Sequence, residues 1–566
     1  DLNINNPTFD DEQTFQIFTK GQTTGIFQFE SPPMREHLKR LKPNSLSDLA
    51  AMNALYRPGP MEYIDEFVDR KFGVKEIKYS HPALEEILKE TYGIIVYQEQ
   101  VIQIANKIGG MSLAEADNLR RAIGKKDLVA MKQQKDKFIS GAQARGIDKK
   151  IAIQIFETID KFANYGFNKS HAVAYSYIAY QTAYLKAHYT PEFLAANLTN
   201  EFGESDKVTK YLEDCRKLKI EVLPPDVNNP SVDFDVVDGK IRFGLSAIKN
   251  VGKIAVQEII KSRKKIGRDF AGIFDFCMNV DTRIVNKRAL EGLVVAGAFD
   301  SLEKNRASIF KAVESALEFG HKVQNSKLAS TSNLFADTDD IKISEPKLPY
   351  SEPWTDKERL ARERVVVGFY ISNHPLIKYN IEYKSFTNFH IGESENLEDK
   401  QEVRACGIIT NVKTKIDRSG KKMAFFKMDD LSGSCECLMF SKIYADCGKY
   451  LIEEEPVYLV GLIESSGDAV KIHVDKLIPI EAAREQLTQS IKITVNKETV
   501  PPENLYTLKS ILEKNSGKFP VYLSLTSNGS KNIIYSLDQY RVSLNSNLLK
   551  SLTDLFGEDS VLLFTK

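Results

Sequence analysis

The spacing of apolar residues changes along the chain, and that change constrains the fold more than any other feature. In 114–123 and 151–162 apolar residues recur at about 3.6 residues, which predicts helices. Between residues 401 and 482 they alternate, which predicts strands. A chain of 566 residues is also too long for one hydrophobic core and favours roughly three to five domains. We therefore expect a multidomain α+β protein.

The alternating region contains five short segments of strand type, which are 403–409, 423–428, 435–440, 457–463 and 470–478. Five strands over about 80 residues favour an OB barrel, a fold whose open face holds single-stranded nucleic acid. The candidates for stacking on bases are Phe425, Phe426 and Phe440, although some of them must belong to the core.

Turn-rich and polar stretches divide the chain into four expected domains. We place them at residues 1–204, 205–375, 376–485 and 486–566. The first two should be mostly helical, the third is the barrel, and the fourth has strand and helix patterns typical of a small α+β domain. The polar composition of residues 321–350 predicts a linker within the second domain.

Positive charge is concentrated in one segment of a chain whose total charge is zero. Residues 118–170 hold 12 Lys and Arg against 5 Asp and Glu, which favours a polyanionic partner at this place. On a helix, Arg121 and Lys125 share a face, where an anion would turn their repulsion into attraction. The alternative is a solvated basic face.

The end of the same segment offers a second device for binding an anion. Asn168 or Ser170 can cap a helix that starts near His171, and the free N–H groups of that helix would face outward. Lys169 and His171 would flank this helix end. An ordinary capped helix is the alternative.

The run from Gly244 to Ala255 predicts a helix-hairpin-helix motif. A tight hairpin of this kind presents backbone N–H groups to a DNA phosphate, and Lys249 and Lys253 add charge without reading sequence. Asn250 stands where the first hairpin glycine is usual, ahead of Gly252. Asn tolerates a left-handed conformation better than other residues with a side chain. A plain helical connection is the alternative.

Cysteine usage and hydropathy indicate where such a chain resides. Its six Cys lack paired metal-ligand spacing, so we expect no metal site and a reducing cytosol. No apolar run reaches the roughly 18 residues that span a bilayer, so we expect no membrane partner and a cytoplasmic location. The first residue is Asp rather than Met, and we expect a piece of a longer protein.

Four blocks of the chain resemble the fingers region of the bacterial replicative DNA polymerase III alpha subunit family (the C-family DNA polymerases); they are residues 54–61, 91–100, 118–126 and 164–171. A weaker resemblance continues to Lys566 and implies the portion from the end of the palm to the C-terminus. The resemblance implies that the triphosphate of the incoming dNTP is bound by Arg120, Arg121, Lys125, Lys169, Ser170 and His171. It also implies contacts to template or nucleotide at Arg57, Tyr97, Gln98 and Asn168.

The resemblance further implies a DNA-directed DNA polymerase, in which carboxylates hold two Mg²⁺ ions for nucleotidyl transfer. The family's aspartate motif has no match here. We therefore expect no catalytic residue in this chain, the carboxylates upstream of Asp1, and no activity of the chain alone. The implied partners are primer–template DNA, single-stranded DNA at the barrel, dNTPs, a sliding clamp, and the clamp-loader tau subunit at the C-terminal domain.

An isolated apolar pair in the linker, Leu334 and Phe335, resembles the short peptide by which polymerases bind a sliding clamp. Thr331 stands where that peptide usually begins with Gln, and a chance hydrophobic pair is the alternative. A second hypothesis for the whole chain is a non-catalytic scaffold that binds nucleic acid and partners through the hairpin, the barrel and the linker. Primer extension separates this hypothesis from the polymerase.

Overall fold

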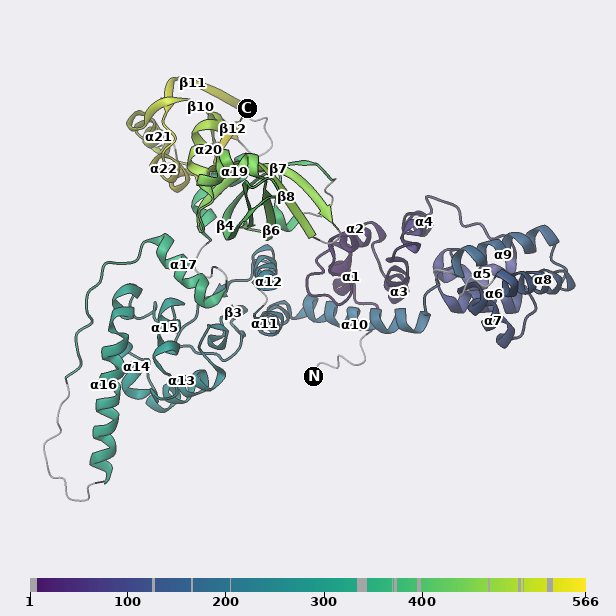
Figure 1. Cartoon of the computed structure of the whole chain (residues 1–566), viewed down its shortest axis with the longest axis horizontal. Coiled ribbons are helices and arrows are strands. Elements are labelled where there is room, and N and C mark those ends of the chain that lie inside the picture. The colour runs from purple at the N-terminus through teal and green to yellow at the C-terminus, as the bar shows by residue number, and fades with distance from the viewer. Residues whose placement is uncertain are drawn as a thin grey trace. The chain divides into compact units, whose positions relative to one another are not determined.

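The computed structural model describes residues 8–124, 128–163, 166–203, 205–332, 344–368, 370, 374–393, 399–466, 469–496, 500–501, 503–526 and 533–565. The chain divides into two compact units, residues 1–194 and 195–566, and each is considered by itself (Figure 1). Helices dominate the first unit, and the second combines helices with a barrel and a mixed sheet. The expected multidomain α+β class is confirmed.

The first unit consists of helices and short 3-10 turns. Its elements are α1 (Glu12–Thr19), α2 (Pro32–Leu41), α3 (Leu46–Leu55), η1 (Pro60–Tyr63), α4 (Ile64–Lys71), η2 (Pro82–Leu84), α5 (Glu85–Leu88), η3 (Lys89–Thr91), α6 (Gln98–Lys107), α7 (Leu113–Gly124), α8 (Leu128–Ala144), α9 (Lys149–Ala163), α10 (Lys169–His188) and α11 (Thr190–Asn200), which continues into the second unit. Helices α6 to α9 enclose an apolar core that includes Ile104, Phe138 and Phe156. This core fixes α7 beside α6, because each helix buries its apolar stripe against the others.

The second unit begins with helices around a small sheet. Its elements are α12 (Ser205–Lys217), β1 (Val222–Leu223), β2 (Asp235–Val237), β3 (Lys240–Arg242), η4 (Leu245–Ala247), α13 (Lys253–Ile266), α14 (Ile273–Asn279), α15 (Lys287–Val295), α16 (Arg306–Ser332), α17 (Asp356–Val367), η5 (Pro375–Tyr379), α18 (Asn380–Phe386) and η6 (Ile391–Glu393). Helices α14 and α15 both pack on α16. The sheet has the order β1-β3-β2.

One expectation about this region is wrong. Residues 321–332 were expected to begin a linker, but they continue α16 as far as Ser332. Val313 and Phe319 are buried in this helix, and Gln324 donates hydrogen bonds to two carbonyl groups of the preceding helical region. Tertiary packing therefore extends the helix past the point where polar composition suggested that it ends. The first compact unit ends at residue 194, and the boundary expected after residue 204 stays a prediction.

A closed barrel follows, and it confirms the five expected strands. Its strands are β4 (Glu402–Ile416), β5 (Lys422–Asp429), β6 (Ser434–Met439), β7 (Pro456–Ser466) and β8 (Ala469–Pro479), joined in the order β4-β5-β6-β8-β7. Helix α19 (Ser441–Cys447) and the turn η7 (Gly448–Tyr450) lie between β6 and β7. Alternate residues fill the barrel, because side chains of a strand point to opposite faces in turn. Asn411 takes a positive φ of 51° where the pairing of β4 with β5 shifts.

The last region forms a four-stranded sheet with helices. Its elements are α20 (Ile480–Leu487), β9 (Thr488–Asn496), α21 (Glu503–Lys514), β10 (Ser516–Thr526), β11 (Ile533–Val542), α22 (Ser546–Phe556) and β12 (Val561–Thr565), and the strand order is β11-β10-β9-β12. Its core is continuous with residues of β4, β7 and β8 on the outside of the barrel. None of the helices in the described parts of the chain is long and apolar enough to cross a membrane.

Candidate nucleotide and nucleic-acid sites

Two arginines of α7 share one carboxylate, that of Asp117. Its Oδ1 accepts from Arg120 Nε at 2.9 Å and Nη2 at 2.8 Å, and its Oδ2 accepts from Arg121 Nε at 2.8 Å. The hydrogen bond from Arg120 lowers the pKa of Asp117, because it stabilises the charged carboxylate. The Arg121 side chain is 64% exposed and that of Arg120 is 25% exposed. Lys125, expected on the same face, lies outside the described residues.

Gln98, the first residue of α6, connects α7 to the loop before α10. Its Oε1 accepts from Arg120 Nη1 at 3.3 Å, and its Nε2 donates to the Gly166 carbonyl at 3.0 Å. Its backbone N–H donates to the Phe167 carbonyl at 2.9 Å, and the Phe167 N–H donates to Val96 at 3.1 Å. These bonds hold α7, the start of α6 and the loop in one arrangement.

The start of α10 has the expected cap. Asn168 Oδ1 accepts from the His171 N–H at 2.8 Å. At the same helix end, the Glu99 carboxylate accepts from the Lys169 N–H at 3.0 Å and from the Asn168 amide at 3.0 Å. Lys169 Nζ pairs with Glu90 at 2.6 Å. A carboxylate of the chain itself therefore lies where helix N–H groups and the helix dipole favour an anion.

Arg57 and His171 line one cavity of the first unit, with a volume of 780 Å³. The Arg57 guanidinium lies 4.3 Å from the centroid of the Phe167 ring, and the rings of His171 and Tyr175 are 4.1 Å apart. Burial lowers the pKa of Arg57, although arginine stays charged at neutral pH. A concave site with a cation and stacked aromatic rings has the features that suit a nucleotide.

Tyr97 and Ser170 lie apart from that cavity. Tyr97 is fully buried, burial raises its pKa, and its hydroxyl has no hydrogen-bond partner among the described residues. Ser170 is exposed and lines, with Lys169, a separate cavity of 720 Å³. The structure thus joins Arg120 to the Asn168–His171 loop through Gln98, groups Arg57 with His171, and places Tyr97 in the core.

Sequence reasoning missed two acidic residues of this region. Asp117 precedes Arg120 and Arg121 by three and four residues, and this helical spacing is a readable signal for ion pairs. Glu99 contacts Lys169 across 70 residues of sequence, so no local pattern reveals it.

The predicted hairpin adopts the predicted backbone. Asn250 has a φ of 68°, the left-handed conformation that only Gly and a few polar residues readily adopt. The Lys249 N–H donates to the Val366 carbonyl of α17 at 2.7 Å. Lys253 begins α13, pairs with Asp233 at 3.1 Å and is 65% exposed. The start of α13 therefore combines helix N–H groups with a positive side chain.

The three phenylalanines of the barrel divide between core and surface. Phe426 lies in the barrel interior and is only 3% exposed. Phe425 is 37% exposed, and Lys415 Nζ lies 5.2 Å from its ring centroid. Phe440 is 47% exposed and packs edge-on against His473 at 5.3 Å. Two aromatic rings are thus available on the barrel surface for stacking on bases.

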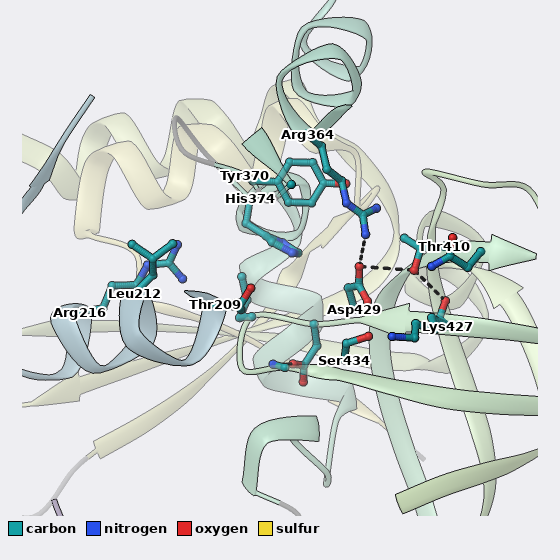
Figure 2. A pocket seen from close by; sticks show the side chains of 15 residues that line it. Thr209, Leu212, Arg216, Arg364, Tyr370, His374, Thr410, Lys427, Asp429 and Ser434 are labelled. Carbon is teal, nitrogen blue, oxygen red and sulfur yellow. Dashed lines mark hydrogen bonds and ion pairs between the residues drawn. The ribbon is translucent and has the colours of Figure 1, made fainter. Parts of the chain in front are cut away.

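A small cavity of 120 Å³ lies where α12, the end of α17 and the barrel meet (Figure 2). Arg364 of α17 pairs there with Asp429 of β5, as Figure 2 shows. Burial, together with the positive charges of Arg216 and Arg364, lowers the pKa of His374 to about 3. His374 is therefore neutral at physiological pH, and its ring nitrogen accepts from the Leu376 N–H. We therefore interpret this cavity as part of the packing between α12, α17 and the barrel and not as a ligand site.

The remaining expected sites have no described geometry. Leu334 and Phe335 lie outside the described residues, so their role as a clamp motif stays a prediction. In the described ranges, no three His, Cys, Asp or Glu side chains are grouped to hold a metal ion.

Three regions of the chain match models of known families. Residues 1–146 match the bacterial DNA polymerase III alpha subunit finger domain, 219–309 match a helix-hairpin-helix motif, and 403–480 match an OB-fold nucleic acid binding domain. The matches to the hairpin and the barrel confirm both predictions. A polymerase finger domain is thus followed by two modules of types that bind nucleic acids, and this combination defines the class of the chain.

Three relatives named DNA polymerase III subunit alpha match nearly the whole chain. The protein of Borreliella burgdorferi is 40% identical over 94% of this chain and 47% of its own length. The Halalkalibacterium halodurans protein is 38% identical over 100% of this chain and 50% of its own length. The Thermus aquaticus protein is 38% identical over 92% of this chain and 43% of its own length. The chain is thus similar to DNA polymerase III alpha subunits over nearly its whole length, which confirms the resemblance that its sequence blocks indicated. It spans about half the length of the curated relatives it matches.

Proposed function

We propose that the chain is the part of a replicative DNA-directed DNA polymerase that binds the triphosphate of the incoming dNTP together with primer–template DNA. The single observation that carries this proposal is the Gln98 bridge, which joins Arg120 to the loop that leads into α10. Arg121, with its exposed guanidinium, and the cavity of Arg57 and His171 lie in the same unit. Guanidinium groups bind phosphate oxygens and stabilise charge on the leaving pyrophosphate.

The catalytic metal ions would be held mainly outside this chain. Phosphoryl transfer in such an enzyme uses divalent cations, and we propose Mg²⁺ bound by carboxylates of the remaining half of the protein. This chain would supply the cations that orient the polyphosphate. It would not add nucleotides alone.

The later modules would hold DNA and partners. The start of α13 suits a DNA phosphate, and Phe425 and Phe440 suit single-stranded bases. We propose a sliding clamp as the partner of the segment that contains Leu334 and Phe335, and the tau subunit of the clamp loader as the partner of the C-terminal domain. A cytoplasmic location fits such a replication protein.

Equilibrium titration tests the proposal. The chain should bind dATP at least tenfold more tightly than deoxyadenosine, and Arg121→Ala should weaken dATP binding by about tenfold, since charge-assisted hydrogen bonds are lost. Lys149→Ala is the matched control, because it removes an exposed positive charge from the neighbouring α9. Equal affinity for dATP and deoxyadenosine would contradict the proposal.

The alternative function is a non-catalytic scaffold, which the hairpin and the barrel also support. This scaffold would bind DNA without a preference for nucleoside triphosphates. A primer-extension assay with the chain alone is the second test: nucleotide addition would show that the metal-binding carboxylates do not lie elsewhere.

A further inference from the structure

Asp117 contacts the two α7 arginines through a particular set of atoms. It accepts from the Nε of each arginine, and from Nη2 of Arg120 in addition. The contact of Arg121 with Asp117 runs through Nε, at 2.8 Å from Oδ2, and the arginine side chain is 64% exposed. The carboxylate thus holds the inner edge of the Arg121 guanidinium and leaves its outer edge toward solvent. This arrangement orients the arginine without occupying the nitrogens that would grip a phosphate.

Gln98 supplies a second support of the same kind. Its side chain is used on both sides, because Oε1 accepts from Arg120 and Nε2 donates to the Gly166 carbonyl. One N–H and one lone pair of the amide remain unused, but the two bonds fix the orientation of the Gln98 side chain. Arg120 is therefore held by Asp117 at one edge and by Gln98 at another. The same Gln98 fixes the loop that places Asn168 at the start of α10.

We propose that Asp117 and Gln98 are positioning residues of the polyphosphate site: they aim Arg121 and Arg120 at the phosphates and do not touch the nucleotide. The inference rests on the proposed function and changes the role of Gln98 from nucleotide contact to support. Preorganised cations bind more tightly because their side chains lose less conformational freedom on binding. Phosphate and Asp117 then act on opposite edges of Arg121 and do not compete.

The sign of the Asp117→Asn effect separates positioning from competition. If the carboxylate competes with phosphate, its neutralisation strengthens binding of an anion. If it positions the arginines, neutralisation weakens binding by about threefold to tenfold, the cost of freeing one or two long side chains. The probe is inorganic tripolyphosphate, which has the charge of the triphosphate without base or sugar. Binding is measured by calorimetry on the whole chain.

Glu115→Gln is the matched control. Glu115 lies on the same helix and pairs with Lys137, so the variant removes the same charge and leaves both arginines in place. Asp117→Glu, which can still reach both arginines, should restore most of the lost affinity. Gln98→Leu should weaken binding like Asp117→Asn, and Gln103→Leu, an exposed change on the same α6, should not. Thermal unfolding of each variant identifies any loss that comes from misfolding.

The outcomes are distinct. If wild type binds tripolyphosphate, Asp117→Asn weakens binding beyond Glu115→Gln, and Asp117→Glu restores it, the inference holds. If wild type binds and Asp117→Asn binds as tightly or more tightly, positioning is overturned and the proposed function stands. If folded wild type does not bind tripolyphosphate or dATP, the proposed function itself fails, and the inference fails with it.

Discussion

Glu363 and Arg364 are consecutive residues of α17, and their charges are bound by different parts of the second unit. Glu363 is fully buried and accepts from Arg306 Nη1, at the start of α16, at 2.9 Å. Arg364 pairs with Asp429 of β5 at 2.5 Å (Figure 2) and with Glu454, just before β7, at 2.7 Å. Helix α17 therefore ties the hairpin-containing helices to the barrel through two neighbouring side chains.

Loss of the buried ion pair between Glu363 and Arg306 should lower the stability of the chain. Glu363→Gln leaves Arg306 with Asp300 but removes its buried charged partner, and it should lower the free energy of unfolding by about 2–4 kcal/mol. Unfolding in urea can be followed through Trp354, the chain's single tryptophan, whose ring lies 4.6 Å from the Arg362 guanidinium of α17. Glu358→Gln, which breaks only an exposed pair with Arg362, should change stability by less than about 0.5 kcal/mol. Equal effects of the two variants would contradict the tie.

The left-handed residue of the hairpin gives a second prediction. Asn250→Ala should destabilise the chain by about 1–2 kcal/mol. In the left-handed conformation the Cβ of alanine crowds the following carbonyl oxygen, and alanine lacks the polar side chain that lets Asn adopt this conformation. Asn250→Gly should be neutral or stabilising and should keep full affinity for double-stranded DNA. Thermal unfolding and DNA titration measure the two effects. A destabilising glycine would mean that the Asn side chain, and not the backbone conformation, is what the hairpin requires.

Asp275 predicts a pH dependence of stability. The hydrogen bond from Arg268 lowers the pKa of Asp275 in the folded chain, below the value of about 3.9 of an unfolded aspartate. The stability it contributes is therefore complete above about pH 4 and is lost as the pH falls through the folded pKa. Asp275→Asn should be less stable than wild type at pH 6, and the difference should shrink toward pH 2. An equal difference at both values would contradict this origin.

Adjacent phenylalanines of β5 should have separate effects. Phe425→Ala should weaken binding of single-stranded DNA by about 1–3 kcal/mol with little change in stability, because its ring is exposed. Phe426→Ala should lower stability by about 3–5 kcal/mol, because its ring fills the barrel. Fluorescence anisotropy with an oligonucleotide and urea unfolding provide the two measurements. Unchanged DNA affinity in Phe425→Ala would place the binding face elsewhere on the barrel.

Local patterns predicted the elements that depend on local physics. The five barrel strands follow from alternation, and Asn168 and Asn250 take the cap and the left-handed turn that their side chains favour. The end of α16 was predicted wrongly, because packing of Gln324 and its neighbours outweighs polar composition. The last domain was predicted only as a small α+β domain, and the order of its strands, β11-β10-β9-β12, was not predicted, because strand pairing joins segments far apart in the sequence.

The sequence predicted the basic residues of the candidate site but not the contacts that hold them in place. Arg120, Arg121 and Lys169 stand out as basic residues, whereas Gln98 and Glu99 become supports only because folding brings α6 against the loop before α10. Such contacts join residues about 70 positions apart, and the periodic spacing of apolar residues does not predict them.

The most direct test locates the polyphosphate on the chain. A dATP analogue with a photoreactive group on its γ-phosphate is bound to the chain, activated by light, and mapped by mass spectrometry. The account predicts cross-links in residues 117–124 and 168–175, abolished by excess tripolyphosphate and reduced in Arg121→Ala. Cross-links confined to the hairpin at 249–253 or to the barrel, and unaffected by Arg121→Ala, would contradict it.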